Sequence, residues 1–149
     1  MPVYKTSFEI NASPRDVWDT VTSFDRYPEW NPQIPEISGP LKVGATLKLR
    51  LTLPGRPALD VSAKVEQLEP SLLLTWRGHV VAPWFFEGYR RFEIQPLEER
   101  RVMFTHVEDI HGMLGPVFSL LMGAPQRRSH EALNQALRTR AEAQDGVRE

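Results

Sequence analysis

Apolar and polar residues alternate along much of the chain, as in β-strands that have one buried and one solvent-facing side. The clearest example is 46–53, where leucines occupy the odd positions and polar or charged residues the even ones. The segment 3–10 alternates in the same way through aromatic and β-branched residues, which favour strands. The same pattern predicts strands at 59–66, 72–79, 86–94 and 101–110. Because the alternation is one-sided, we expect antiparallel strands with one wet face.

Two segments have helical spacing instead. Ser13 and Pro14 are typical of a helix N-cap and first helical position, and the apolar residues that follow predict about three turns, ending near Phe24. The second helix should run from about 114 to 143, and Pro125 should bend or interrupt it. The prolines and aromatic residues of 25–35 predict a short turn or helical corner between the first helix and the rest of the sheet.

This order of elements predicts one α+β domain that spans residues 1–149. A curved antiparallel sheet of about seven strands would have one apolar face, and only the long C-terminal helix is available to cover it. We therefore expect the sheet to wrap around that helix, with short helices after the first strand. A curved sheet and a cylinder rarely fill the space between them, so we predict an internal cavity of a few hundred Å³, as in typical ligand sites.

Composition excludes several classes of partner and chemistry. The formal net charge of -1 gives no general attraction to nucleic acids or anionic lipid surfaces. The chain contains no cysteine, so disulfides, thiolate nucleophiles and cysteine-ligated zinc are absent. We see no signal peptide and no apolar segment of the ~20 residues that a membrane helix needs. We expect a cytoplasmic protein without integral membrane association or nucleic-acid partner, as a monomer or weak homodimer.

Two segments near the start, 10–18 and 27–32, resemble the opening of a known protein superfamily. The similarity continues through 74–78 and 89–94 and into the closing helix, so that it covers essentially the whole chain. On these segments the chain resembles the START-related superfamily, also labelled SRPBCC or polyketide cyclase/dehydrase-like. The resemblance implies a helix-grip fold with a central apolar pocket. It implies fold strongly and function weakly, because the superfamily includes lipid carriers, hormone receptors, aromatase/cyclases and many small bacterial proteins.

Three charged or titratable residues share the alternation of apolar residues that should face this pocket. Arg90 has the parity of Phe92, and His106 and Glu108 have the parity of Phe104. Buried charge is costly unless it is paired, so we expect the three groups to form one cluster. In the functional interpretation, Arg90 binds a carboxylate, enolate or phenolate while His106 or Glu108 moves a proton. In the alternative interpretation, the cluster is structural and does no chemistry.

Large apolar side chains should complete the pocket, in its rim, wall and floor. Aromatic residues more often simply build a core, so each of these assignments has a structural alternative. Besides the three charged or titratable residues, we predict ligand contacts for Trp30, Trp76, Trp84, Phe86, Phe92, Phe104, Met113, Phe118 and Met122.

Motifs for cofactors and metals are missing. The sequence has no Walker loop, no G-x-G-x-x-G, no G-x-S-x-G and no H-E-x-x-H. His106-x-Glu108 resembles half of a nucleobase-deaminase motif, but the cysteine-containing half is absent. His79, His111 and His130 have no evident partner at metal-ligand spacing. We therefore expect neither a cofactor nor a metal.

Three functions remain open from the sequence. The first is binding of a small hydrophobic or amphipathic ligand, possibly anionic or aromatic, in the internal cavity. The second is an enzyme of the polyketide cyclase, aromatase or dehydratase type. The third is an accessory or stress protein that contacts another protein through the loop around Trp84. A closed dry cavity would favour binding, polar groups converging at its centre would favour an enzyme, and a filled core would favour the third function.

Overall fold

The computed structural model describes residues 3–147 except 53, 56, 81–86 and 113–114, and it describes no side chains for 115–123. The fold is α+β, as predicted. Its elements are, in order, β1 (Val3–Ile10), α1 (Pro14–Thr22), the short 3₁₀ helix η1 (Phe24–Arg26), α2 (Tyr27–Trp30), β2 (Glu36–Ser38), β3 (Thr46–Leu51), β4 (Leu59–Glu69), β5 (Leu73–His79), β6 (Glu87–Glu98), β7 (Arg101–His111) and α3 (Gly115–Val147).

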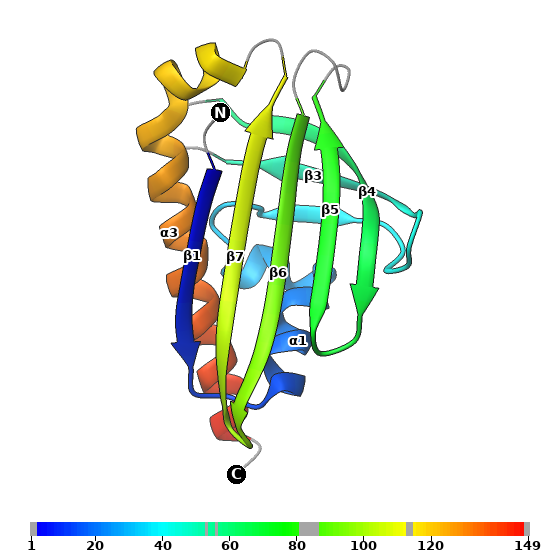
Figure 1. Ribbon diagram of the computed structural model, residues 1–149, viewed down its shortest axis with the longest axis vertical. Coiled ribbons are helices and arrows are strands. Elements are labelled where there is room, and N and C mark those ends of the chain that lie inside the picture. The colour runs from blue at the N-terminus through cyan, green and yellow to red at the C-terminus, as the bar shows by residue number, and fades with distance from the viewer. Residues whose placement is uncertain (1–2, 53, 56, 81–86, 113–114, 148–149) are drawn as a thin grey trace.

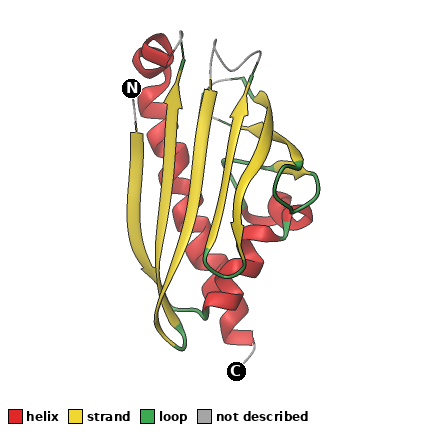
Figure 2. Ribbon diagram, turned by 45° about the vertical axis from the view of Figure 1, so that its right-hand side comes forward, coloured by secondary structure: helices red, strands yellow, loops and turns green. Residues whose placement is uncertain are grey.

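The seven strands form one antiparallel sheet in the order β1-β7-β6-β5-β4-β3-β2. Strands β2 to β7 follow one another as a meander, and β1 adds to the far edge beside β7. In Figure 1 the β2–β3 part of the sheet turns across the long strands β5, β6 and β7. Figures 1 and 2 both show α3 lying along one face of this curved sheet, which is the helix-grip arrangement.

The predicted inward faces of the strands are the buried ones. Leu47, Leu49 and Leu51 are buried in β3, while the residues between them are exposed. The same alternation continues along β7 and through the middle of β6. The irregularity in the β6–β7 pairing lies between Pro96 and Glu98, near the hairpin turn, so it does not invert the faces of the preceding residues.

The predicted helices form, with one difference at the end of the first helix. The side chain of Ser13 accepts a hydrogen bond from the Asp16 backbone N–H, which caps α1, but α1 ends at Thr22 and Phe24 begins η1. The last helix begins and ends within a few residues of the predicted positions. Pro125 lies inside α3 without interrupting it, and Figure 1 shows the helix changing direction in its N-terminal part. None of the described helices is long and apolar enough to cross a membrane.

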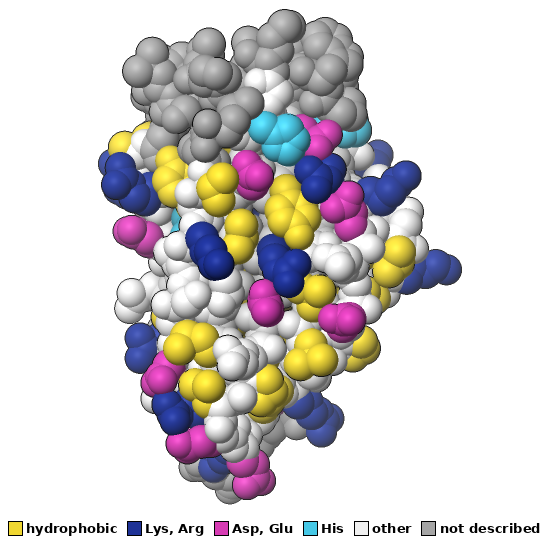
Figure 3. All heavy atoms as spheres, viewed as in Figure 1, with side chains coloured by type: hydrophobic (Ala, Val, Ile, Leu, Met, Phe, Trp, Pro, Cys, Tyr) yellow, Lys and Arg dark blue, Asp and Glu magenta, His cyan; other side chains and the backbone are white. Residues whose placement is uncertain are grey.

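The outer face of β1, β7 and β6 carries charges of both signs. On the described part of the face seen in Figure 3, arginine and lysine side chains lie among aspartate and glutamate side chains. Arg101 of β7, for example, contacts Glu9 of β1 at 2.8 Å and Glu98 of β6 at 2.7 Å. The described part of this face therefore presents no extended patch of one sign.

Candidate functional site

A buried cluster of polar side chains lies between the sheet and α3. Arg90 of β6 stands opposite Glu108 of β7, and His106 lies two residues before Glu108 on the same inward face. The three side chains are 6%, 3% and 0% exposed, respectively. Arg90 Nη1 lies 3.1 Å from Glu108 Oε1 and 2.8 Å from His106 Nε2. The two strands thus bring together the three residues that were predicted from the sequence to form one cluster.

Other elements contribute members that sequence reasoning missed. Gln33, in the loop after α2, accepts from Arg90 at 2.7 Å and donates to Glu108 Oε1 at 2.8 Å. Helix α3 contributes Gln126, His130 and Asn134, all buried. Their spacing of four residues places them on one face of the helix, which is the signal that could have identified them.

The sequence showed no evident partner for His130 at metal-ligand spacing, but the fold brings this side chain against several members of the cluster. Its Nδ1 lies 2.8 Å from Glu108 Oε1, and its Nε2 lies 2.8 Å from the hydroxyl of Thr6 on β1. Its ring also stacks on that of His106, with the ring centres 3.9 Å apart and the planes within 4° of parallel. These contacts join residues 22 to 124 positions apart in the sequence, so local spacing could not reveal them.

The direction of the hydrogen bonds follows from what each group can donate. A guanidinium only donates, so His106 Nε2 must accept from Arg90 and its proton sits on Nδ1. His106 Nδ1 therefore donates to Asn134 Oδ1 at 2.8 Å. Asn134 Nδ2 then donates to Thr6 Oγ1 at 2.7 Å. With the His130 ring neutral, the Thr6 hydroxyl donates to His130 Nε2, and His130 Nδ1 donates to Glu108.

We call this closed set of contacts the polar ring: Arg90, His106, Asn134, Thr6, His130 and Glu108. With both imidazoles neutral, one arrangement of protons satisfies every contact in it. Its charges are then one guanidinium and one carboxylate, which neutralise each other.

The surroundings of the ring explain two perturbed pKa values. Burial, and then the charge of Arg90, hold the pKa of His106 well below its ordinary value. Burial by itself would raise the pKa of Glu108, but Arg90 and the hydrogen bond from His130 outweigh it, so the pKa of that carboxyl lies below its usual range. At neutral pH, Glu108 is therefore ionised and His106 is neutral.

A small cavity of about 60 Å³ touches one side of this ring. Arg90 and Glu108 line it together with apolar side chains that include Leu49, Val61 and Trp76. Its other lining residues are Leu51, Gly78, His79, Val80, Gly88, Tyr89 and Ile110. The cavity thus has a charged pair on an otherwise largely apolar wall.

The cavity beside the polar ring is smaller, among the described residues, than the predicted few hundred Å³. Phe92 packs edge-on against Trp76 with ring centres 5.5 Å apart, and its ring centre lies 5.8 Å from that of Phe104. All three rings are buried. Aromatic side chains that were expected to line the space instead fill it, and only Trp76 reaches the cavity wall.

Of the remaining predicted contact residues, the structure describes the side chain of Trp30, which lies apart from this site. Trp30 is half-buried against Tyr27 and lines an outer groove with Arg26 and Arg140, so its assignment to the rim of the central cavity was wrong. Trp84, Phe86 and Met113 lie outside the described residues, as do the side chains of Phe118 and Met122.

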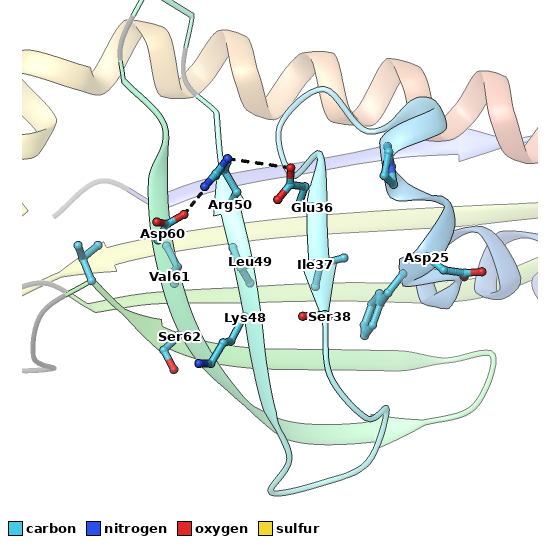
Figure 4. Close-up of a pocket in the computed structure, with 13 residues that line it drawn as sticks. Asp25, Glu36, Ile37, Ser38, Lys48, Leu49, Arg50, Asp60, Val61 and Ser62 are labelled. Atoms are coloured by element: carbon cyan, nitrogen blue, oxygen red, sulfur yellow. Dashed lines mark hydrogen bonds and ion pairs between the residues drawn. The ribbon is translucent and has the colours of Figure 1, made fainter.

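A larger open groove of about 660 Å³ crosses β2, β3 and β4. Figure 4 shows Arg50 between Asp60 and Glu36, which it contacts at 3.2 and 4.0 Å. Lys48 lies in the next row of outward residues, between Ser38 and Ser62. The ion pairs of this groove are exposed, and nothing buried converges on it comparable to the polar ring.

The polar ring also contains a possible set of metal ligands. Ligand atoms of His106, Glu108 and His130 lie within 4.8 Å of one another. However, Arg90 Nη1 already donates to His106 Nε2 and Glu108 Oε1, which are two of the atoms that a metal would need. A cation at this position would also lie beside the guanidinium. As the side chains stand, they do not fit a metal ion.

Comparison with known protein families agrees with the helix-grip fold. A family model described as "Polyketide cyclase / dehydrase and lipid transport" matches residues 1–142. No curated protein sequence matches the chain.

Solved structures with similar folds include proteins of different roles. The Zhui aromatase/cyclase from Streptomyces sp. R1128 superposes with a TM-score of 0.75 at 15% identity, over 95% of this chain and 93% of that one. A START superfamily protein from Mycobacterium smegmatis gives 0.72 at 23% identity, over 95% and 97%. Norcoclaurine synthase from Thalictrum flavum gives 0.68 at 14% identity, over 94% and 93%. At these identities the similarity shows the fold alone.

Proposed function

Because the chain belongs to the polyketide cyclase/dehydrase and lipid transport family, we propose that it binds a small amphipathic molecule between the sheet and α3. In this proposal the polar group of the ligand meets Arg90 and Glu108, and its apolar part lies against Leu49, Val61 and Trp76. The family description covers both catalysis and transport, so the choice between them rests on the site.

One observation carries the proposal: an arginine and a carboxylate side by side on the wall of a largely apolar cavity. Arg90 can only donate hydrogen bonds and ionised Glu108 can only accept them. Together they complement a group that both donates and accepts, such as an alcohol, a phenol, an enol or a protonated acid. Because Glu108 already balances the charge of Arg90, a bound carboxylate would add an uncompensated buried charge. The structure thus favours neutral hydroxyl groups over the anions expected from Arg90 alone.

The size of the cavity limits how the ligand is held. About 60 Å³ is below the roughly 300–1,000 Å³ of typical small-molecule sites. A ligand with more than a few heavy atoms must therefore widen the cavity when it binds. The apolar side chains Leu49, Leu51 and Val61 come from the adjacent strands β3 and β4, so movement of these strands is the most direct way to enlarge it.

For a molecule in the cavity, the state of the polar ring supports binding over proton transfer to or from the imidazoles. Both nitrogens of His106 and both nitrogens of His130 are occupied within the ring. Neither imidazole therefore offers a free nitrogen to a molecule in the cavity. Glu108 lines the cavity, but its lowered pKa makes it a weak base. These features favour a binding protein over an enzyme of the cyclase or aromatase type.

Fluorine NMR with three small aromatic probes tests the proposal. We expect 4-fluorophenol to bind about fivefold more tightly than fluorobenzene, because one added hydrogen bond contributes about 1 kcal/mol. 4-Fluorobenzoate should bind more weakly than the phenol. In the double variant Arg90→Met/Glu108→Gln, which removes both charges together, the preference for the phenol should disappear while fluorobenzene still binds.

The matched control is Arg77→Met/Glu66→Gln. Arg77 and Glu66 form an ion pair of 3.1 Å on the outer face of neighbouring strands, with both side chains nearly 40% exposed. This control should leave all three affinities unchanged. Absence of binding by any probe, or a phenol preference that survives in the Arg90/Glu108 variant, would contradict the proposal.

A further inference from the structure

Three members of the polar ring have the order of a hydroxyl nucleophile, a base and an orienting carboxylate. The hydroxyl oxygen of Thr6 lies 2.8 Å from His130 Nε2, and His130 Nδ1 lies 2.8 Å from Glu108 Oε1. Triads of this kind are recognised by geometry and roles, not by sequence position. We propose that Thr6 is an activated nucleophile that accepts an acyl group from a reactive ester. This activity differs from ligand binding in the cavity, which Glu108 lines but Thr6 and His130 do not.

Burial and the contact with Glu108 fix the orientation of the base. His130 is 1% exposed and Glu108 is 3% exposed, so water does not compete for the bond between them. Because Glu108 accepts at His130 Nδ1, the neutral imidazole presents the unprotonated Nε2 to Thr6. After Nε2 takes a proton, the adjacent carboxylate stabilises the imidazolium that forms.

Asn134 aligns the nucleophile. Its Nδ2 donates to Thr6 Oγ1 at 2.7 Å, so it occupies one lone pair and leaves the hydroxyl proton for His130. Thr6 is half-buried, in contrast to the other members of the triad. It lies on β1, an edge strand of the sheet, next to α3 in Figure 1. Thr6 is therefore the least buried member of the triad.

The reaction needs no other reagent. Thr6 Oγ attacks the ester carbonyl carbon, and its proton passes to His130 Nε2. The bond from that carbon to the leaving oxygen breaks, and the departing alkoxide takes the proton from His130. The products are an acyl ester of Thr6 and an alcohol. Water can then attack the acyl ester with His130 as the base, which releases the acid and restores the Thr6 hydroxyl.

Acetylation by 4-nitrophenyl acetate provides the test. We expect release of nitrophenolate and one acetyl group on the peptide that contains Thr6, detected by mass spectrometry after digestion. Thr6→Ser should still be acetylated at this position, whereas Thr6→Val, which keeps the size of the side chain, should not. His130→Gln should slow the reaction at least about 100-fold, the lower range for loss of a general base.

Thr105→Val is the matched control. The Thr105 hydroxyl lies 2.9 Å from that of Ser7 on the other side of the same strand pair, and no histidine contact accompanies this hydrogen bond among the described residues. Its variant should react as the wild type does. Thermal melting of each variant separates loss of folding from loss of reaction. If the wild type gains acetyl groups only on lysines or the N-terminus, or if Thr6→Val is modified equally, the proposal is wrong and the ring is structural.

Discussion

His106 is neutral because of its surroundings. The side chain is fully buried, Arg90 donates to one ring nitrogen and Asn134 accepts from the other. Burial and Arg90 both lower its pKa, and nearby Glu108 only partly opposes them. The charged groups that face the His106 imidazole are therefore Arg90 and Glu108, and the imidazole of His130 stacks on it. The folded protein holds His106 unprotonated under conditions in which the unfolded chain would bind a proton.

This difference predicts that acid destabilises the fold. The unfolded state takes up a proton at His106 below about pH 6.5, whereas the folded state does not, so the unfolding free energy falls as the pH decreases. One such proton changes the free energy by about 1.4 kcal/mol per pH unit. Glu108 adds a second loss of the same sign below about pH 4.3. Urea unfolding at pH 7, 6 and 5 measures the first effect.

Substitution of individual histidines identifies the source of this effect. His106→Gln keeps groups that can accept and donate but cannot bind the proton, so it should flatten the dependence on pH between 6 and 5. His79→Gln, at a half-buried position where β5 ends, should leave the slope unchanged. A slope that is the same in His106→Gln and the wild type would show that another group is responsible.

At the level of single elements, β3 separates the two faces of the sheet most sharply. Leu49 is 6% exposed and packs in the core, whereas Lys48 next to it is exposed. Leu49 also lines the small cavity, so its position affects both stability and the site. Substitutions at these two positions of β3 therefore test directly which face of the sheet is buried.

We predict that Leu49→Asp unfolds or aggregates the protein, whereas Lys48→Asp is nearly neutral. An unpaired charge on the buried face costs several kcal/mol, a large part of the roughly 5–15 kcal/mol that stabilise a typical domain. A surface substitution usually changes stability by about 0.5 kcal/mol or less. Melting temperatures of the two variants measure the difference, and equal values would mean that the faces of β3 are assigned wrongly.

For the whole molecule, the C-terminal end of α3 is tied to two other parts of the fold. Asp145 accepts from Arg100 in the β6–β7 turn at 2.6 Å and from the backbone N–H of Ser13 at the start of α1 at 3.1 Å. One turn earlier, Glu142 accepts from the backbone N–H of Asn11 at 2.8 Å. These contacts anchor the helix at the end of the molecule opposite the start of β6, so they help to keep the sheet wrapped around it.

Asp145→Ala should therefore destabilise the protein by about 1.5–3 kcal/mol, the range for hydrogen bonds to charged groups. Asp145 is buried, and its loss leaves the backbone N–H of Ser13 without this acceptor. Asp60→Ala removes a comparable aspartate from Arg50, but that side chain is 80% exposed and should matter little. Denaturant unfolding compares the two variants, and a similar small effect for both would argue against the anchoring role.

The sequence by itself determined the elements, their faces and therefore the general fold. Alternation with period two is a local property of a strand, so it assigned Arg90, His106 and Glu108 to one inward face without any knowledge of the sheet order. A single long amphipathic helix after the strands then left only one way to cover that face. The helix-grip fold and the convergence of these three side chains follow from such local rules.

Only the tertiary structure decided what the three residues contact and how much space remains beside them. Thr6, Gln33, His130 and Asn134 reach the polar ring from an edge strand, a loop and a helix, and their positions depend on how α3 is rotated against the sheet. The volume of the cavity depends on whether Trp76 and its aromatic neighbours interlock or stand apart. Neither these contacts nor the cavity volume can be predicted from residue spacing along the chain, because both arise from packing between segments far apart in sequence.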